Sequence, residues 1–205
     1  MNILAIGAHP DDIEFGCGGT LIKYAKAKKN VHLLVLTDGS FGGDPGVRRA
    51  EQKRSAKFMG AKELFWGGLK DTEVVNTREL ILKMEGVIRK VRPDTVFLNY
   101  YGDVHQDHRA VSLAGISATR YIKEVLFYEV PTTHSFDPDV FVDIKDVLNK
   151  KMRLLELHAS QIDKTRVKNL TIIESSRSCA NFRGFQGRVK YAEGFKALRL
   201  LREIR

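Results

Sequence analysis

Two short segments of this chain combine histidine with aspartate at close spacing. His9-Pro10-Asp11-Asp12 and His105-Gln106-Asp107-His108 hold three of the six histidines in the sequence. Each segment follows a stretch of apolar residues that is typical of a buried strand. Imidazoles and carboxylates are common ligands of catalytic metal ions, so the two segments together predict a metal-dependent hydrolase.

The predicted ligand set is His9, Asp12 and His108. His9 and Asp12 are three residues apart at a strand-to-helix turn, where both side chains can converge on one ion. His108 would complete a set of two histidines and one aspartate, with the fourth position of a tetrahedral site open for water. Zinc in such a site lowers the pKa of its bound water to about 7 and polarises a carbonyl oxygen. Iron(II) suits the same ligands in a reducing environment.

The other polar side chains of the two segments then have catalytic roles. Asp11 lies beside the ion without being needed as a ligand, and we expect it to act as the general base toward the bound water. His105 would lie across the substrate, where it stabilises a tetrahedral oxyanion or protonates the leaving nitrogen. Asp107 is expected to orient one of the histidines.

These residue types also have a structural interpretation. Aspartates just before a helix are commonly N-caps, and a single histidine usually serves the fold. Here, however, both segments follow strands, and in an open parallel sheet ligands bind beyond the carboxyl ends of the strands. Their shared position favours the catalytic interpretation.

A run of glycines, Gly16-Cys17-Gly18-Gly19, follows the first segment. It is not a dinucleotide-binding GxGxxG motif, because Leu21 stands where the third glycine would be needed. We expect the glycines to permit close packing of a helix on the sheet, and Cys17 to be a small buried residue.

Apolar runs alternate with helical patterns along most of the chain, which predicts an α/β fold with helices on both faces of a mostly parallel sheet. The predicted strands are Asn2–Ala8, Val31–Thr37, Glu63–Trp66, Asp94–Tyr100, Glu124–Tyr128 and Val140–Ile144. The predicted helices are Gly18–Lys28, Val47–Met59, Thr77–Val91, Asp107–Tyr121, Val147–Ser160 and Tyr191–Arg202. No linker or repeat divides them, so a single domain over residues 1–205 is expected.

Composition narrows the class of protein further. The chain is 43% hydrophobic and 29% charged, with a formal net charge of +9. The positive charge is spread along the chain without interleaved aromatics, so no nucleic-acid partner is expected. No apolar run approaches the roughly 20 residues of a membrane span, and the short apolar N-terminus lacks the basic flank of a signal peptide. Two cysteines cannot form a disulfide framework, which fits a reducing cytoplasm.

The motifs resemble those of the LmbE/PIG-L family of zinc-dependent N-acetylglucosamine deacetylases. The resemblance depends on Ala8-His9-Pro10-Asp11-Asp12 followed by Gly16 and Gly19, and on His105-x-Asp107-His108. Ser160-Gln161 and Tyr191-Ala192-Glu193-Gly194-Phe195 resemble the branch with the bacillithiol-biosynthesis deacetylases. The resemblance implies a Rossmann-like fold without a nucleotide, removal of the acetyl group from an N-acetylglucosamine-type sugar conjugate, and a homo-oligomer.

The resemblance implies the same zinc ligands, the same general base and the same oxyanion-facing histidine as those given above. It adds three candidates for binding the substrate, which are Arg48, Asp71 and Asp103. Gln106 replaces a proline that is usual in the family, and the segment between Tyr128 and Val140 looks trimmed. The identity of the group attached to the sugar is therefore not predicted.

Other interpretations remain open at this point. An amidase that cleaves a larger acyl group from a thiol-sugar conjugate would use the same site. A non-catalytic sugar- or metal-binding module would need the ligands but neither Asp11 nor His105. Arg48 and Glu51 would form a surface ion pair if their role were structural, and such pairs contribute little.

Overall fold

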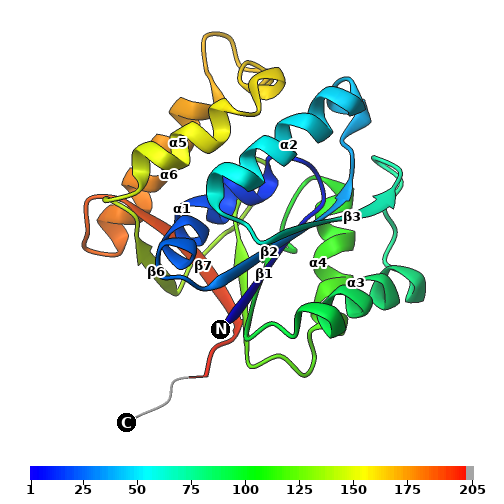
Figure 1. Cartoon of the computed structure of the whole chain (residues 1–205). Helices are drawn as coiled ribbons and strands as arrows, with labels where there is room; N and C mark the ends of the chain where they lie inside the picture. The colour runs from blue at the N-terminus through cyan, green and yellow to red at the C-terminus, as the bar shows by residue number, and fades with distance from the viewer. Residues whose placement is uncertain (202–205) are drawn as a thin grey trace.

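A computed structural model describes residues 1–201 of the chain. Within them, strands form one sheet in the order β3-β2-β1-β4-β5-β7-β6 (Figure 1). The strands are β1 (Asn2–Gly7), β2 (Asn30–Thr37), β3 (Glu63–Leu69), β4 (Thr95–Asn99), β5 (Glu124–Tyr128), β6 (Val140–Asp143) and β7 (Ala192–Arg199). β1 to β5 pair in parallel, whereas β7 is antiparallel to both β5 and β6.

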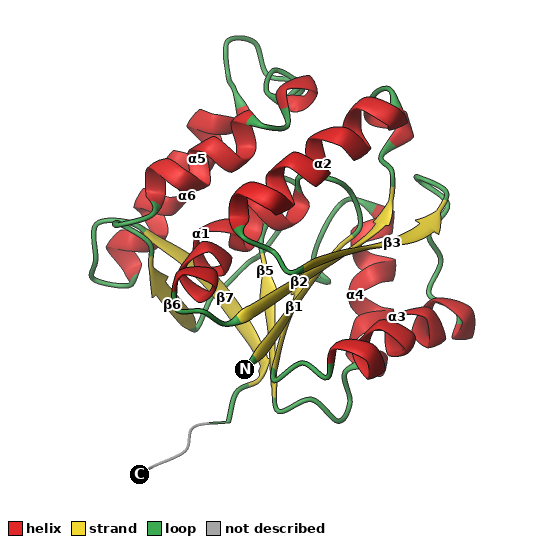
Figure 2. Cartoon of the chain, in the orientation of Figure 1, coloured by secondary structure: helices red, strands yellow, loops and turns green. Residues whose placement is uncertain are grey.

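Helices cover both faces of this sheet (Figure 2). They are α1 (Asp12–Lys26), α2 (Pro45–Met59), α3 (Arg78–Val91), α4 (Gln106–Ala118), α5 (Leu148–Glu156) and α6 (Ile172–Gln186), with short 3-10 helices at Ser40–Gly42 and Ala159–Gln161. One face of the sheet carries α3 and α4, and the other face carries α1, α2, α5 and α6. A buried apolar cluster lies between the sheet and each of these two layers of helices. The predicted three-layer α/β fold is confirmed.

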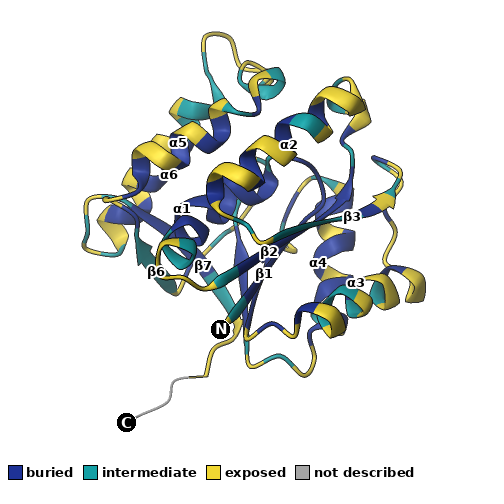
Figure 3. Cartoon of the chain, viewed as in Figure 1, coloured by how far each residue is buried: buried dark blue, intermediate teal, exposed yellow. Residues whose placement is uncertain are grey.

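The central strands are buried on both sides, as Figure 3 shows in dark blue. Continuous apolar runs such as Ile3-Leu4-Ala5-Ile6 are expected for parallel strands between two helical layers, because neither face meets water. Among the described residues, no helix is both long and apolar enough to cross a bilayer.

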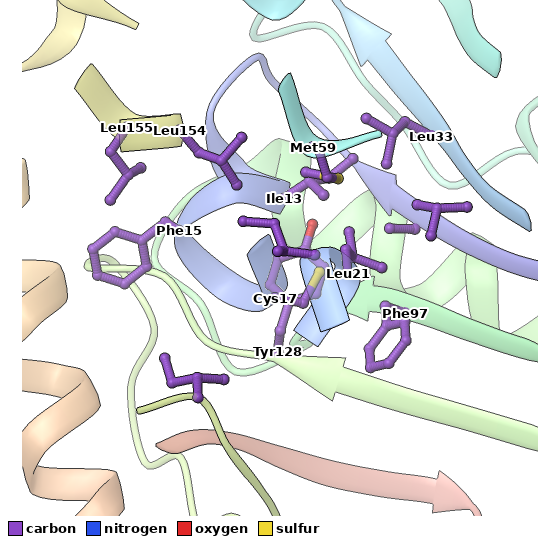
Figure 4. Close-up of a cluster of buried hydrophobic side chains, with 14 of the residues drawn as sticks. Ile13, Phe15, Cys17, Leu21, Leu33, Met59, Phe97, Tyr128, Leu154 and Leu155 are labelled. Carbon is purple, nitrogen blue, oxygen red and sulfur yellow. The ribbon is translucent and has the colours of Figure 1, made fainter. Parts of the chain in front are cut away.

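The glycine run lets α1 approach the sheet closely. A Cβ atom on Gly16 would lie 2.0 Å from Cδ2 of Tyr128, and one on Gly19 would lie 3.0 Å from Cγ2 of Ile144. Figure 4 shows Tyr128 against Cys17 of α1 within the buried cluster. The predicted packing role of the glycines is confirmed, and Cys17 is fully buried as expected.

One prediction near the C-terminus is wrong. Tyr191–Arg202 was expected to be a helix, and its last residue lies outside the described part of the chain. The segment instead contains strand β7, because hydrogen-bonded pairing with β5 and β6 outweighs the helix propensity of its Ala, Leu and Arg residues.

Helix α6 was not predicted, since its Ser- and Gly-containing sequence is a weak helix former. A readable signal was present in the capping box of Thr171 and Glu174. The other elements match with shifted ends. The largest shifts are in α1, which begins at Asp12 instead of Gly18, and in α5, which ends at Glu156 instead of Ser160.

Replacing Gly16 with alanine should destabilise the protein, because the new methyl group overlaps the Tyr128 ring. We expect Gly16→Ala to lower the free energy of unfolding by about 1–3 kcal/mol in urea titrations. Gly86→Ala, at an exposed position of α3, is the matched control, because the nearest atom lies 4.0 Å from the added Cβ. It should stabilise by up to about 1 kcal/mol through helix propensity. Equal effects at both positions would contradict the packing argument.

Candidate active site

The two histidine-aspartate segments meet at the carboxyl edge of the sheet. His9 follows β1, Asp12 begins α1, and His108 lies in the first turn of α4, directly after β4. Because β1 and β4 are neighbours and parallel, both loops emerge at the same edge. Nδ1 of His9 is 3.1 Å from Nε2 of His108. Oδ2 of Asp12 lies 3.5 Å from Nδ1 of His9 and 3.3 Å from Nε2 of His108.

These three atoms fit the ligand positions of one tetrahedral metal ion. Zinc binds nitrogen and oxygen ligands at about 2.0–2.1 Å, which corresponds to distances of about 3.3 Å between ligands. His9, Asp12 and His108 also line the same cavity, so a fourth coordination position would face open space. The structure thus brings the predicted ligand set together with a geometry suited to zinc or to iron(II).

The other ring nitrogen of each of these histidines contacts buried carboxylates. Nε2 of His9 lies 3.1 Å from Oδ2 of Asp107 and 3.0 Å from Oδ1 of Asp71. Nδ1 of His108 lies 3.2 Å from Oδ2 of Asp103. Such contacts fix the tautomer and the ring orientation of a metal-binding histidine. Asp107 also accepts hydrogen bonds from the backbone N–H groups of Thr72 and Val74, at 2.8 and 3.3 Å.

Two other groups of candidate ligands share His9, one with His105 and His108 and one with Asp71 and Asp107. Asp107 is fully buried and does not line the cavity. His9, Asp12 and His108 all line the cavity, which favours this set over one that includes Asp107 for a metal with an open coordination position.

The electrostatics of the cluster favour a bound cation. Burial lowers the pKa of His9, but hydrogen bonds to Asp107, Asp12 and Asp71 outweigh burial and raise that pKa well above its usual value. Burial likewise opposes charge on His108, whereas Asp12 and Asp103 raise its pKa to about 9. The carboxylates therefore stabilise positive charge where a metal ion would supply it.

Asp11 occupies the N-cap position of α1 with an unusual backbone conformation. Its φ of 93° lies in the left-handed region, and its side chain makes no capping hydrogen bond. Nη2 of Arg48 donates to Oδ2 of Asp11 at 3.2 Å and to the Pro10 carbonyl at 2.7 Å, while Nη1 donates to the Gly39 carbonyl at 2.7 Å. Burial raises the pKa of Asp11, and the Arg48 charge offsets part of that rise. Strained backbone of this kind is common at functional sites.

The proposed surface ion pair between Arg48 and Glu51 is wrong, because both side chains are buried and they do not pair. Glu51 instead accepts hydrogen bonds from the backbone N–H and the hydroxyl of Ser160, at 2.9 and 2.6 Å.

His105 presents one nitrogen to the cavity. Its Nδ1 accepts a hydrogen bond from the backbone N–H of Asp107 at 3.2 Å, which leaves the proton of the neutral ring on Nε2. Burial lowers the pKa of His105, and the neighbouring charges of His9 and His108 lower it further. His105 therefore lines the cavity as a neutral imidazole that can donate from Nε2.

The three predicted substrate-binding residues are placed differently from one another. Arg48 and Asp71 line the cavity, and Oδ2 of Asp71 also accepts the backbone N–H of Phe41 at 2.8 Å. Asp103 does not line it. Its carboxylate accepts hydrogen bonds from the backbone N–H of His105 and from the Thr133 hydroxyl, at 2.8 and 2.9 Å, and contacts His108.

Sequence reasoning missed several polar residues that support the site. Asn99, at the end of β4, donates to Oδ2 of Asp12 at 3.4 Å. Gln52 accepts from the backbone N–H of Asp11 at 3.3 Å and donates to the buried Glu14 at 2.7 Å. Arg48, Gln52 and Ser55 follow a helical spacing along α2, so a buried polar stripe was a readable signal.

A cavity at the carboxyl edge of a parallel sheet, with a buried set of two histidines and one aspartate, defines the site of a metal-dependent hydrolase. Comparison with known proteins agrees with this class. The chain belongs to the PIG-L family, described as GlcNAc-PI de-N-acetylase, which its residues 4–119 match. The family predicted from the motifs is confirmed.

Individual relatives are also deacetylases by name. An uncharacterized deacetylase, YaiS of Escherichia coli (strain K12), is 36% identical over 77% of this chain and 90% of its own. The diacetylchitobiose deacetylase of Thermococcus kodakarensis is 35% identical over 78% of this chain and 69% of its own. Among solved structures, the conserved protein TT1542 from Thermus thermophilus has a TM-score of 0.89 at 25% identity, covering 100% of this chain and 97% of that one.

The contact between Asp103 and His108 predicts a role in metal binding. Asp103→Asn should weaken zinc affinity about 10–100-fold in chelator competition, because the His108 ring loses its charged partner. Asp137→Asn, in an exposed loop, is the matched control and should leave the affinity unchanged. A variant with normal zinc affinity but a raised KM would instead make Asp103 a substrate-binding residue.

The raised pKa values of His9 and His108 predict how the metal-free protein responds to pH. Both groups bind protons more tightly in the folded state, so their stabilisation is complete below about pH 6.5. The part from His108 is lost as the pH rises through about 9, and the part from His9 is lost as the pH rises through its own raised pKa. Urea unfolding of chelator-treated protein should therefore give a falling free energy of unfolding across that interval. His108→Asn should reduce the slope, while the exposed His134→Asn should not. A slope unchanged in His108→Asn would refute the assignment.

Proposed function

We propose that this chain hydrolyses the acetamide of an N-acetylglucosamine-type sugar conjugate, releasing acetate and a free amine. The observation that carries the proposal is the convergence of His9, Asp12 and His108 on one point of the cavity wall, with Asp11 and His105 beside them. The deacetylases among the relatives support the reaction class.

Zinc is the metal that we propose for the site, held by Nδ1 of His9, Oδ2 of Asp12 and Nε2 of His108. Iron(II) would accept the same ligands. When bound, the metal polarises the amide carbonyl and lowers the pKa of a water molecule. Asp71, Asp103 and Asp107 would keep the two histidines oriented through the ring nitrogens that do not bind the metal.

Asp11 is the proposed general base. It would accept a proton from the attacking water as the water oxygen bonds to the carbonyl carbon, and then deliver that proton to the amine nitrogen as the C–N bond breaks. Arg48 would hold the carboxylate and the strained turn in place through its contacts with Asp11 and Pro10. The raised pKa of Asp11 suits a group that must accept a proton near neutral pH.

His105 is the proposed donor to the oxyanion. A neutral imidazole with its proton on Nε2 can donate to the carbonyl oxygen as negative charge develops there. Because its pKa is lowered, His105 is better suited to this role than to supplying a proton to the leaving nitrogen. Asp71, on the cavity wall, would accept a hydrogen bond from a sugar hydroxyl.

The setting that we propose for this chain is a reducing compartment and a homo-oligomer. Cys17 and Cys179 are both free thiols, which supports a reducing compartment such as the cytoplasm. Exposed Phe182 and Phe185 on α6 support contact with a second copy, in a homo-oligomer. The proposed partner is a small-molecule sugar conjugate, and no nucleic-acid partner is proposed. The chain is proposed to form a single domain.

Replacing the proposed base tests the mechanism. Asp11→Asn in zinc-loaded protein should reduce acetate release from N-acetylglucosamine conjugates at least about 100-fold, because an amide cannot accept the proton. Zinc content by atomic emission should stay near that of the unmodified protein, since Asp11 is not a proposed ligand. Asp163→Asn removes an exposed carboxylate and serves as the matched control. Near-full activity in Asp11→Asn would exclude the proposed base.

A further inference from the structure

The cavity continues beyond the proposed metal site into a compartment with apolar walls. These walls come from α1, the end of β5, α5, and the loop and first turn leading into α6, and they consist of Phe15, Val130, Leu155, Leu170 and Ile172. Figure 4 shows Phe15 and Leu155 together at the edge of the buried cluster, where α1 meets α5. We call this part of the cavity the apolar compartment.

The cavity is larger than an acetylated amino sugar needs. Its volume is about 870 Å³, and cavities of about 300–1,000 Å³ enclose most of a drug-sized ligand. The polar end, with Asp11, Arg48 and Asp71, provides the partners that sugar hydroxyls require. The apolar compartment is therefore available to another part of the substrate.

Three polar side chains next to the apolar compartment are hydrogen-bonded to the protein, and the exposed Lys164 and Arg166 line the cavity beyond them. The carboxylate of Glu129 accepts from Nε and Nη2 of Arg183, at 2.6 and 2.7 Å. The hydroxyl of Ser175 donates to the Thr171 carbonyl at 3.1 Å, and that of Thr165 donates to the Leu170 carbonyl at 2.7 Å. An ionised carboxylate has no proton to donate, and both hydroxyl protons are used within the protein, so none of these three groups has a donor left for a second sugar.

Cys179 adds to the apolar character of this compartment. Burial raises the pKa of its thiol to about 12, with the nearby Glu129 carboxylate raising it further. The thiol therefore stays neutral near pH 7 and is not a nucleophile. It contributes a polarizable, weakly polar surface to the wall.

Building on the proposed deacetylation, we propose that the apolar compartment selects substrates that carry a compact alkyl or aryl group on the amino sugar. A sugar packed against the apolar side chains of this wall would lose hydrogen bonds to water without regaining them from those side chains, which disfavours binding. Each methylene group buried there favours binding. The group could be attached at the glycosidic oxygen or on the acyl side of the amide, and both attachments present the same chemistry to the wall.

Two substrate series distinguish these attachments. One holds methyl, n-hexyl and phenyl glycosides of N-acetylglucosamine together with diacetylchitobiose, and the other holds methyl glycosides of N-butyryl- and N-hexanoylglucosamine. With zinc-loaded protein, we expect kcat/KM to rise about tenfold or more with apolar size in one series. If the glycoside series responds, the hexyl glycoside should also exceed diacetylchitobiose. The series that responds identifies the side of attachment.

Variants of the wall locate the effect. Leu170→Ser and Ile172→Ser, each at a partly buried position, should reduce the preference for the favoured hexyl substrate over its short-chain counterpart to about threefold or less. Ile81→Ser is the matched control, since Ile81 is also partly buried but lies on α3, on the opposite face of the sheet. It should keep the full preference.

Equilibrium binding separates this proposal from the reaction itself. Calorimetric titration with hexyl and methyl glycosides of glucosamine and with N-hexanoyl- and N-acetylglucosamine measures binding without hydrolysis. If no amide is hydrolysed but hexyl or hexanoyl compounds bind about tenfold tighter, the compartment stands and the proposed function fails. If acetamides are hydrolysed but neither rates nor affinities change with apolar size, the compartment is refuted and deacetylation stands.

Discussion

The parallel pairing of β1 with β4 is the contact on which the site depends. Ile3, Leu4 and Ala5 align with Thr95, Val96 and Phe97, so the two strands end side by side at the centre of the sheet. The chain between them passes through β2, α2, β3 and α3, yet the loops that follow β1 and β4 open at the same edge. Two segments nearly a hundred residues apart thus supply atoms 3.1 Å from each other.

Neighbouring elements stabilise the charged groups and the strained backbone at this edge of the sheet. Four aspartates, Asp12, Asp71, Asp103 and Asp107, surround two imidazoles with little access to water. Such a concentration of buried carboxylates is unfavourable without positive charge beside it. The left-handed backbone at Asp11 is similarly held by Arg48, which joins the turn after β1 to the loop after β2. The buried face of α2 therefore stabilises a turn that would otherwise relax.

Much of this arrangement could be predicted from the sequence. The apolar strand patterns predicted that both segments lie at the carboxyl edge of the sheet. The positions of His9, Asp12 and His108 in the two segments were then enough to expect that these residues meet. The position of Asp103 could not be predicted, because a carboxylate near a site can face the substrate or the back of a ligand, and only the path of the chain decides. Strand β7 was missed for a similar reason, since its pairing partners lie far away in sequence and local propensity favoured a helix.

The Tyr128 ring joins core packing to the chemistry of the site. The ring fills the space that a side chain at position 16 would need, and its hydroxyl lies 2.9 Å from the Ile6 carbonyl and 3.2 Å from Oδ1 of Asn99. Asn99 in turn contacts Asp12. Tyr128, which does not line the cavity, is therefore two contacts away from the proposed ligand Asp12. A random-mutagenesis screen for lost activity would consequently recover Gly16 and Tyr128 together with the ligands, and tolerance to substitution alone would not separate architecture from catalysis in this protein.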